Sequence, residues 1–249
     1  MPLSFEKTPV AGFGFVSVST TTQKLYFTTR ANGYIQAADL NTRSSIRLTK
    51  DLHPKVYEAL FTADGSVVER SINDTGAITT FAGTIKTTVA SGTTSVTLDG
   101  FFFPQNIFEF SVNPTTKSVF YLTHAAGGVG SVGVTAQWDG GKQKQLFTSL
   151  IGGWHTQYLP DGRIILTESP ADNHTGYAYQ LNSDGTLTDI VRNIPGLTVS
   201  LDPSTKALLY GQSSQGTLSL YVQTAPTATT TALSIATIAD KCVWAPGKS

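Results

Sequence analysis

The sequence is poor in groups that carry charge or form cross-links. Charged residues make up 14% of its 249 positions, 17 basic and 17 acidic side chains cancel, and Cys242 is the only cysteine. A single cysteine excludes an internal disulfide, and we expect it to be a buried small hydrophobe. No cluster of Lys and Arg could replace the counterions of a nucleic acid, so nucleic acid is not a predicted partner.

Membrane and export signals are also missing. No apolar run reaches about 18 residues, so no membrane span is predicted. The segment Met1–Gly12 lacks the apolar centre of a secretory signal. These two absences leave a cytoplasmic protein, or one whose targeting segment lies outside this chain.

Motifs for metal, phosphate and nucleophilic chemistry are likewise absent. The four histidines have neither the i, i+2 nor the i, i+4 spacing of zinc ligands. No EF-hand loop, phosphate-binding loop or G-x-S-x-G elbow occurs. We therefore predict no metal, no cofactor and no catalytic residue, although the carboxylates leave a glycosidase pair open.

A repeated β unit is what the sequence does contain. Each unit has a short apolar strand, a tight polar turn, a second apolar strand, and then a glycine that opens a third strand. The second strands are anchored at Leu25, Val67, Val119, Ile164 and Leu208. These anchors lie 42, 52, 45 and 44 residues apart, a spacing typical of four-stranded propeller blades.

The turns of this unit have suitable chemistry. Ala63-Asp64-Gly65 and Pro160-Asp161-Gly162 are each expected to form the turn between a first and a second strand. Gly accepts the positive φ of such a turn, and Pro160 presets φ in the second of them. Third strands are expected to open at Gly33, Gly76, Gly130 or Gly133, Gly176 and Gly216. The sequence predicts an all-β protein almost without helix, a β-propeller rather than a sandwich or solenoid.

We expect one propeller domain over residues 1–249 and about five blades. The blades are placed roughly at 10–50, 54–100, 105–149, 153–192 and 196–239, with a partial unit at 240–249. Asp240–Trp244 is interpreted as the first strand of a sixth unit, so the ring is expected to be incomplete. Open blade edges would then expose apolar surface and favour self-association. One repeat is longer than the others, and its additional residues lie in Lys86–Gly100. We expect them to form an extra hairpin that turns at Ser91-Gly92-Thr93, and we expect Phe101–Phe103 to enter the core.

Three short stretches carry a family resemblance: Pro54–Ala59, Gly176–Tyr179 and Asp240–Trp244. Their sequences resemble an uncharacterised family of predicted exported seven-bladed β-propeller proteins from small-genome bacteria. The resemblance implies a propeller held outside the membrane, at the cell envelope, and this chain lacks that family's N-terminal anchor and final blades. It implies no activity and no catalytic residues.

One face of the expected propeller gathers polar and aromatic side chains. Loops that join strand 4 to strand 1 and strand 2 to strand 3 lie on the same face of a propeller. Our assignment places the four histidines and four neighbours in these loops, as candidate ligand-binding residues: Arg30, His53, His124, Trp154, His155, Glu168, Asp172 and His174. Exposed aromatics beside charge suit ligand binding.

These observations favour a non-catalytic binding or scaffold propeller on the bacterial cell envelope, with a protein or glycan as its ligand. The alternative is a propeller-type glycan hydrolase or lyase whose site lies on the histidine-bearing face. A third hypothesis is one structural domain of a longer surface protein. Converging carboxylates or histidines with perturbed pKa would favour the enzyme.

Overall fold

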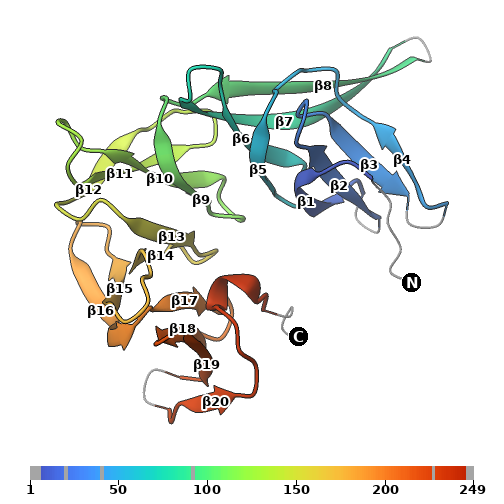
Figure 1. Ribbon diagram of the computed structural model, residues 1–249. Coiled ribbons are helices and arrows are strands. Elements are labelled where there is room, and N and C mark those ends of the chain that lie inside the picture. Colours follow the sequence, from blue (N-terminus) through green and yellow to red (C-terminus); the bar gives the residue numbers. More distant parts are fainter. Residues whose placement is uncertain (1–6, 20–21, 40–41, 91–92, 226–227, 245–249) are drawn as a thin grey trace. The chain divides into compact units, whose positions relative to one another are not determined.

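The computed structural model describes residues 7–19, 22–39, 42–90, 93–225 and 228–244. Across these residues it contains twenty strands and one short 3-10 helix. The strands form five antiparallel four-stranded sheets, each built from consecutive strands in sequence order (Figure 1). Contacts divide the chain into two compact units, residues 1–108 with 136–143 and residues 109–135 with 144–249.

The first unit contains sheets 1 and 2. Sheet 1 comprises β1 (Val10–Ser17), β2 (Gln23–Thr29), β3 (Ile35–Asp39) and β4 (Ser44–Arg47); sheet 2 comprises β5 (Val56–Phe61), β6 (Ser66–Ile72), β7 (Ile78–Ala90) and β8 (Thr93–Phe102). Val16, Tyr26, Ile35 and Val67 form the core between the sheets. Gly12 makes this packing possible, because a Cβ there would lie 1.9 Å from the Ala59 carbonyl oxygen.

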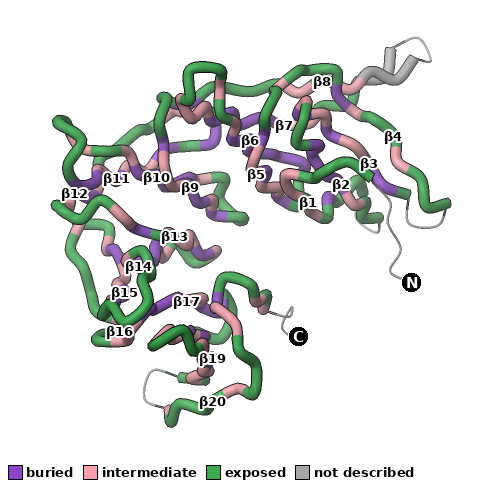
Figure 2. Tube along the Cα trace, viewed as in Figure 1, coloured by how far each residue is buried: buried purple, intermediate pink, exposed green. Residues whose placement is uncertain are grey.

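The second unit contains most of sheet 3 and all of sheets 4 and 5. Sheet 3 comprises β9 (Ile107–Val112), β10 (Ser118–His124), β11 (Ser131–Gln137) and β12 (Lys144–Ser149); sheet 4 comprises β13 (Trp154–Tyr158), β14 (Ile164–Glu168), β15 (Thr175–Leu181) and β16 (Leu187–Pro195); sheet 5 comprises β17 (Thr198–Leu201), β18 (Leu208–Ser214), β19 (Thr217–Gln223) and β20 (Thr231–Leu233). Leu159, Ile165, Leu201 and Leu208 pack together in one core cluster of this unit. Buried residues concentrate in the strands, whereas turns are exposed (Figure 2).

The repeat expected from the sequence is present. All five anchors lie in the second strand of their sheet. Leu25, Val67, Ile164 and Leu208 pair with equivalent residues near the end of the first strand. Of the glycines expected to open third strands, Gly33, Gly76, Gly130 and Gly216 have positive φ, as a glycine before the strand should; Gly176 lies inside β15 instead.

The surplus in Lys86–Gly100 does not form a separate hairpin. It lengthens the β7–β8 hairpin, whose pairing continues from Phe81↔Phe102 to Ala90↔Thr93. Residues 91–92 of the expected Ser91-Gly92-Thr93 turn lie outside the described residues. The expectation that all three phenylalanines enter the core is wrong: Phe103 is buried, but Phe101 and Phe102 are 39% and 56% exposed.

The strand expected at Asp240–Trp244 is wrong as well. Ala239–Lys241 form the 3-10 helix η1, and the chain continues without a strand to Trp244. Cys242 and Trp244 pack on Leu209 and Leu220 of sheet 5, and Trp244 Nε1 donates to Ser200 Oγ at 3.0 Å. The apolar side chains after β20 therefore cover part of sheet 5 instead of forming the first strand of a new sheet.

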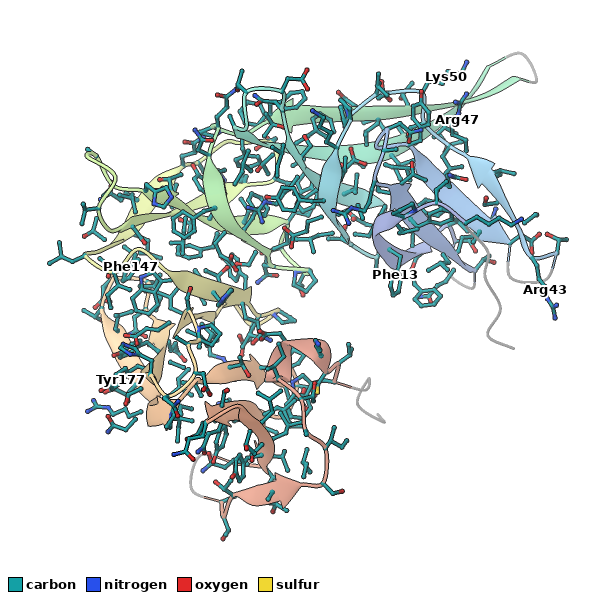
Figure 3. All side chains as sticks on the ribbon, viewed as in Figure 1. Phe13, Arg43, Arg47, Lys50, Phe147 and Tyr177 are labelled. Atoms are coloured by element: carbon teal, nitrogen blue, oxygen red, sulfur yellow. The ribbon has the colours of Figure 1, made fainter. Side chains whose placement is uncertain are left out.

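The first strand of sheet 1 carries exposed aromatic side chains. Phe13 and Phe15 of β1 are 68% and 53% exposed. The Phe13 side chain projects from this strand (Figure 3). They alternate with Gly12 and Gly14, which approach Ala59 and Phe61 on the opposite side of the strand. Self-association of the protein through open blade edges stays a prediction.

Candidate functional site

Two of the expected ligand-binding residues lie in the first unit, and His53 is the more constrained. Its Nδ1 lies 2.5 Å from Glu69 Oε2, and its ring contacts Phe81 and Phe102 at centroid distances of 4.6 and 5.7 Å. Glu69 is 1% exposed and also accepts a hydrogen bond from Thr28 Oγ1 at 3.2 Å. Since a buried carboxylate needs such partners, His53 holds the loop before β5 onto sheet 2.

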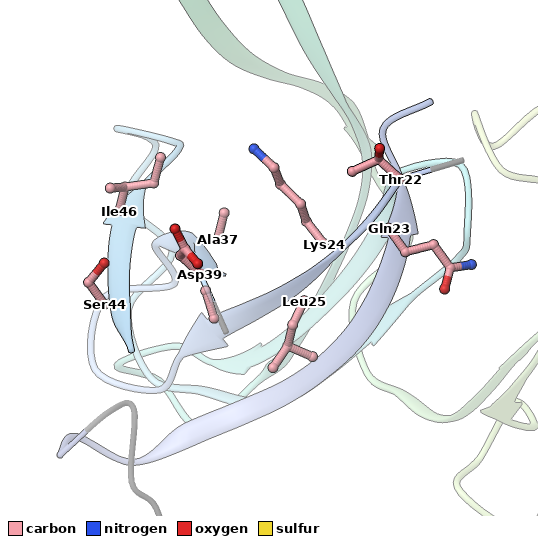
Figure 4. Close-up of a pocket in the computed structure, with 9 residues that line it drawn as sticks. Thr22, Gln23, Lys24, Leu25, Ala37, Asp39, Ser44 and Ile46 are labelled. Carbon is pink, nitrogen blue, oxygen red and sulfur yellow. The ribbon is translucent and has the colours of Figure 1, made fainter. Parts of the chain in front are cut away.

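Arg30 is exposed after β2 and lines a shallow hollow of about 500 Å³ with Lys55, Tyr57 and Ile72. Lys55 is already engaged by Asp74 at 2.5 Å. A second hollow, of about 440 Å³, lies over β2, β3 and β4 (Figure 4). None of the eight expected residues lines that second hollow.

Trp154 is not an exposed ligand-binding residue, contrary to expectation. It opens β13, is 3% exposed, and packs edge-on against Phe147 and Tyr179. Its indole Nε1 donates to the Ile151 carbonyl at 3.1 Å. Because side chains alternate along a strand, burial of Trp154 turns His155 to the opposite face.

His155 lies instead in a cluster with Glu109 of β9 and Asp240 of η1, which we call the Glu109–His155–Asp240 cluster. His155 Nδ1 lies 3.7 Å from Glu109 Oε1, and the imidazole side chain is 51% exposed. The same carboxylate oxygen accepts a hydrogen bond from the Thr156 backbone N–H at 3.2 Å, which fixes its position. All three residues belong to the second unit.

The charges in this cluster shift one another's pKa. The Glu109 carboxylate, at ion-pair distance, raises the pKa of His155; partial burial opposes the rise and the Asp240 charge adds to it. Loss of water around Asp240 raises the pKa of its carboxyl; the His155 charge opposes that rise and the Glu109 charge adds to it. Both groups therefore bind protons more tightly here than in an unfolded chain.

The sequence did not identify Glu109 or Asp240 as site residues. The repeat contains a pattern that could have pointed to Glu109. A glutamate is the third residue of the first strand in two successive sheets, Glu58 in β5 and Glu109 in β9. Asp240 had no such signal, since its segment was interpreted as a strand. Its place depends on the η1 turn, which only the packing against sheet 5 reveals.

The remaining expected residues do not join the cluster. Burial raises the pKa of Glu168 at the end of β14, whereas the His174 charge and the Tyr177 N–H lower it. Asp172 accepts hydrogen bonds from Ser213 Oγ at 2.7 Å and Gly216 N–H, so it ties the β14–β15 loop to the β18–β19 hairpin. His124 is the exposed last residue of β10. Within the described ranges, no set of three or more His, Cys, Asp or Glu side chains is placed to hold a metal ion.

Comparison with known proteins identifies the fold. No protein-family model and no curated protein matches the sequence. Among solved structures, a putative TolB from Agrobacterium tumefaciens is similar, with TM-score 0.62 and 12% identity over 91% of this chain and 81% of that one. TolB from Acinetobacter baumannii gives TM-score 0.54 and 16% identity, covering 82% of this chain. The chain has the β-propeller fold.

One further solved structure that is similar to this chain is that of an enzyme. Virginiamycin B lyase from Staphylococcus aureus is 16% identical with TM-score 0.53, over 95% of this chain and 73% of that one. The chain spans half the length of the Acinetobacter TolB chain. At these identities the likeness shows the fold alone, so function is argued from the site. Within the described part of the chain, no helix has the length and apolarity needed to span a membrane.

Proposed function

We propose that the protein is a binding propeller that docks a positively charged group of a partner protein at the Glu109–His155–Asp240 cluster. The carrying observation is that the Glu109 carboxylate lies 3.7 Å from one half-exposed imidazole and that the Asp240 charge also acts on that imidazole. Among the described residues, no Lys or Arg forms an ion pair with Glu109 or Asp240. A cation supplied by a partner would relieve the mutual repulsion of these carboxylates.

The cluster also offers a rigid frame for such a contact. Glu109 and His155 come from strands rather than loops, and the Thr156 N–H holds the Glu109 carboxylate. Because these groups are ordered before binding, little conformational entropy is lost when a ligand arrives. The nidogen–laminin complex among the solved structures that resemble this chain, at 11% identity and TM-score 0.51, contains a protein–protein interface. That likeness supports a protein ligand only by analogy.

A labelled Lys-containing peptide, and the same peptide with acetylated lysines, test this proposal by fluorescence anisotropy. We expect the charged peptide alone to bind, and E109Q or D240N to weaken binding roughly 3–10-fold, with loss at high salt. Gln at position 109 still accepts the Thr156 hydrogen bond, which separates charge from structure. D51N, which removes an exposed charge elsewhere, is the matched control. Equal binding of the acetylated peptide, or equal weakening by D51N, would contradict the proposal.

The second candidate is a glycan hydrolase or lyase with its site at the same cluster. The observation that favours it is the raised pKa of both His155 and Asp240, since a raised pKa favours the protonated form that a general acid needs. Incubation with a panel of neutral and acidic polysaccharides, followed by measurement of released ends, tests it. Cleavage by the wild type that H155Q abolishes would replace the binding proposal, and no cleavage would reject the enzyme.

We also propose that the protein works outside the cytoplasm, at the bacterial cell envelope. The support is the resemblance of Pro54–Ala59, Gly176–Tyr179 and Asp240–Trp244 to exported propeller proteins. Fractionation of the native cells with detection by antibody should find the protein in the envelope fraction. Recovery in the cytosol alone would reject this location.

A further inference from the structure

A third cavity lies between sheets 4 and 5 within the second unit. It has a volume of about 300 Å³, at the lower end of the range of roughly 300–1,000 Å³ for small-molecule sites. Arg163 and Lys206 line it, together with the side chains of Ile190, Leu201 and Leu208. None of these residues belongs to the Glu109–His155–Asp240 cluster.

Arg163 is the most informative of these residues. It lies in the turn between β13 and β14, where its Nε donates to Asp161 Oδ2 at 2.7 Å. Its Nη2 is buried and has no hydrogen-bond partner among the described residues. A buried guanidinium donor without an acceptor costs free energy. Because Nη2 is enclosed by protein, only the remaining part of the Arg163 guanidinium can meet a ligand in the cavity.

Lys206 places a second positive charge in the same cavity. It lies in the equivalent turn of sheet 5, between β17 and β18, and its charge helps to lower the pKa of Asp161. Two acidic groups are near, but both are engaged: Asp161 by Arg163 and Asp189 by Arg192. Among the charged residues that line the cavity, Arg163 and Lys206 are cationic and Asp189 is anionic, so positive side chains outnumber negative ones.

The apolar part of the cavity limits the kind of anion that fits. Leu201 and Leu208 belong to the core cluster between the two sheets, and Ile190 packs on that cluster. An inorganic anion would leave this apolar surface without a partner, whereas a carbon skeleton would cover it. A guanidinium matches the planar carboxylate in particular.

We propose that this inter-sheet cavity binds a small organic carboxylate. The Arg163 guanidinium donates to the carboxylate, Lys206 supplies the second charge, and the Leu201–Leu208 surface packs against the ligand's carbon skeleton. The occupant is a free small molecule, because the cavity volume is too small for a folded partner.

Benzoate, its neutral analogue benzamide, and inorganic phosphate are the probes. Saturation-transfer NMR and thermal unfolding should show binding of benzoate and a rise in Tm that benzamide and phosphate do not give. R163Q and K206Q should each weaken benzoate binding at least about tenfold. K144Q, which removes an exposed lysine of β12 in the same unit, is the matched control and should bind as wild type.

Three results would overturn the proposal: equal binding of benzamide, equal binding of phosphate, or unchanged benzoate binding in both R163Q and K206Q. If R163Q fails to fold, K206Q alone decides, because Lys206 forms no ion pair in the described residues whose loss would unfold the sheet. The peptide-binding experiment at the Glu109–His155–Asp240 cluster uses other residues, so the two proposals fail independently.

Discussion

Trp154 and His155 are neighbours in sequence whose side chains take opposite faces of β13, so they form a matched pair for testing the structure. Replacing Trp154 with Ala removes a side chain that is 3% exposed and packed against Phe147 and Tyr179. Truncation of a buried Trp in a protein core costs about 3–5 kcal/mol, including the cavity that remains. The lost hydrogen bond from Nε1 to the Ile151 carbonyl adds roughly 1 kcal/mol.

Replacing His155 with Ala should cost less than about 1 kcal/mol, because the side chain is half exposed and its ion pair with Glu109 is partly solvated. Urea unfolding followed by far-ultraviolet circular dichroism measures both variants, so that loss of a Trp does not change the signal. Equal m-values would show that the difference in midpoint reflects stability. A loss below 1 kcal/mol in W154A, or a larger loss in H155A than in W154A, would refute the assigned faces of β13.

Three further outcomes are expected. Since the pKa of His155 is raised above its ordinary value of 6.5, its stabilising contribution is complete below that pH and is lost as pH rises through the folded pKa; Tm should therefore fall from pH 6 to pH 8 less steeply in H155Q than in wild type. G12A should destabilise the first unit by more than about 2 kcal/mol because its Cβ meets the Ala59 carbonyl, whereas G152A, with open space around it, should change the midpoint of urea unfolding little. W244A should uncover the Leu209–Leu220 cluster of sheet 5, seen as increased binding of a hydrophobic dye and a loss of roughly 1–3 kcal/mol because Trp244 is half-buried; unchanged dye binding would contradict the packing of Trp244.

The repeat could be predicted from the sequence because local rules determine it. Apolar anchors such as Val67 and Val119 recur at blade spacing, and Gly76 and Gly130, which follow them, have positive φ. Turn chemistry and strand alternation act over a few residues, so one sequence suffices to identify them. The spacing of the anchors also revealed the additional residues in Lys86–Gly100. It did not reveal that these residues lengthen the β7–β8 hairpin, because that depends on the pairing of the two strands.

The candidate site was predicted less well because it depends on contacts between distant segments. Glu109 and His155 are 46 residues apart in numbering, and Asp240 joins them only through η1. Trp154 was expected in an exposed loop together with His155, but both residues lie in β13, where alternation of side chains buries Trp154 and exposes His155.

The most direct test of the central claim, that Glu109, His155 and Asp240 act as one electrostatic group, is an NMR titration of the His155 ring. In the wild type we expect the His155 pKa above 6.5, and in E109Q we expect it to fall towards that value because the interaction with the carboxylate is lost. A His155 pKa at or below 6.5 in the wild type, or one that E109Q leaves unchanged, would contradict the account.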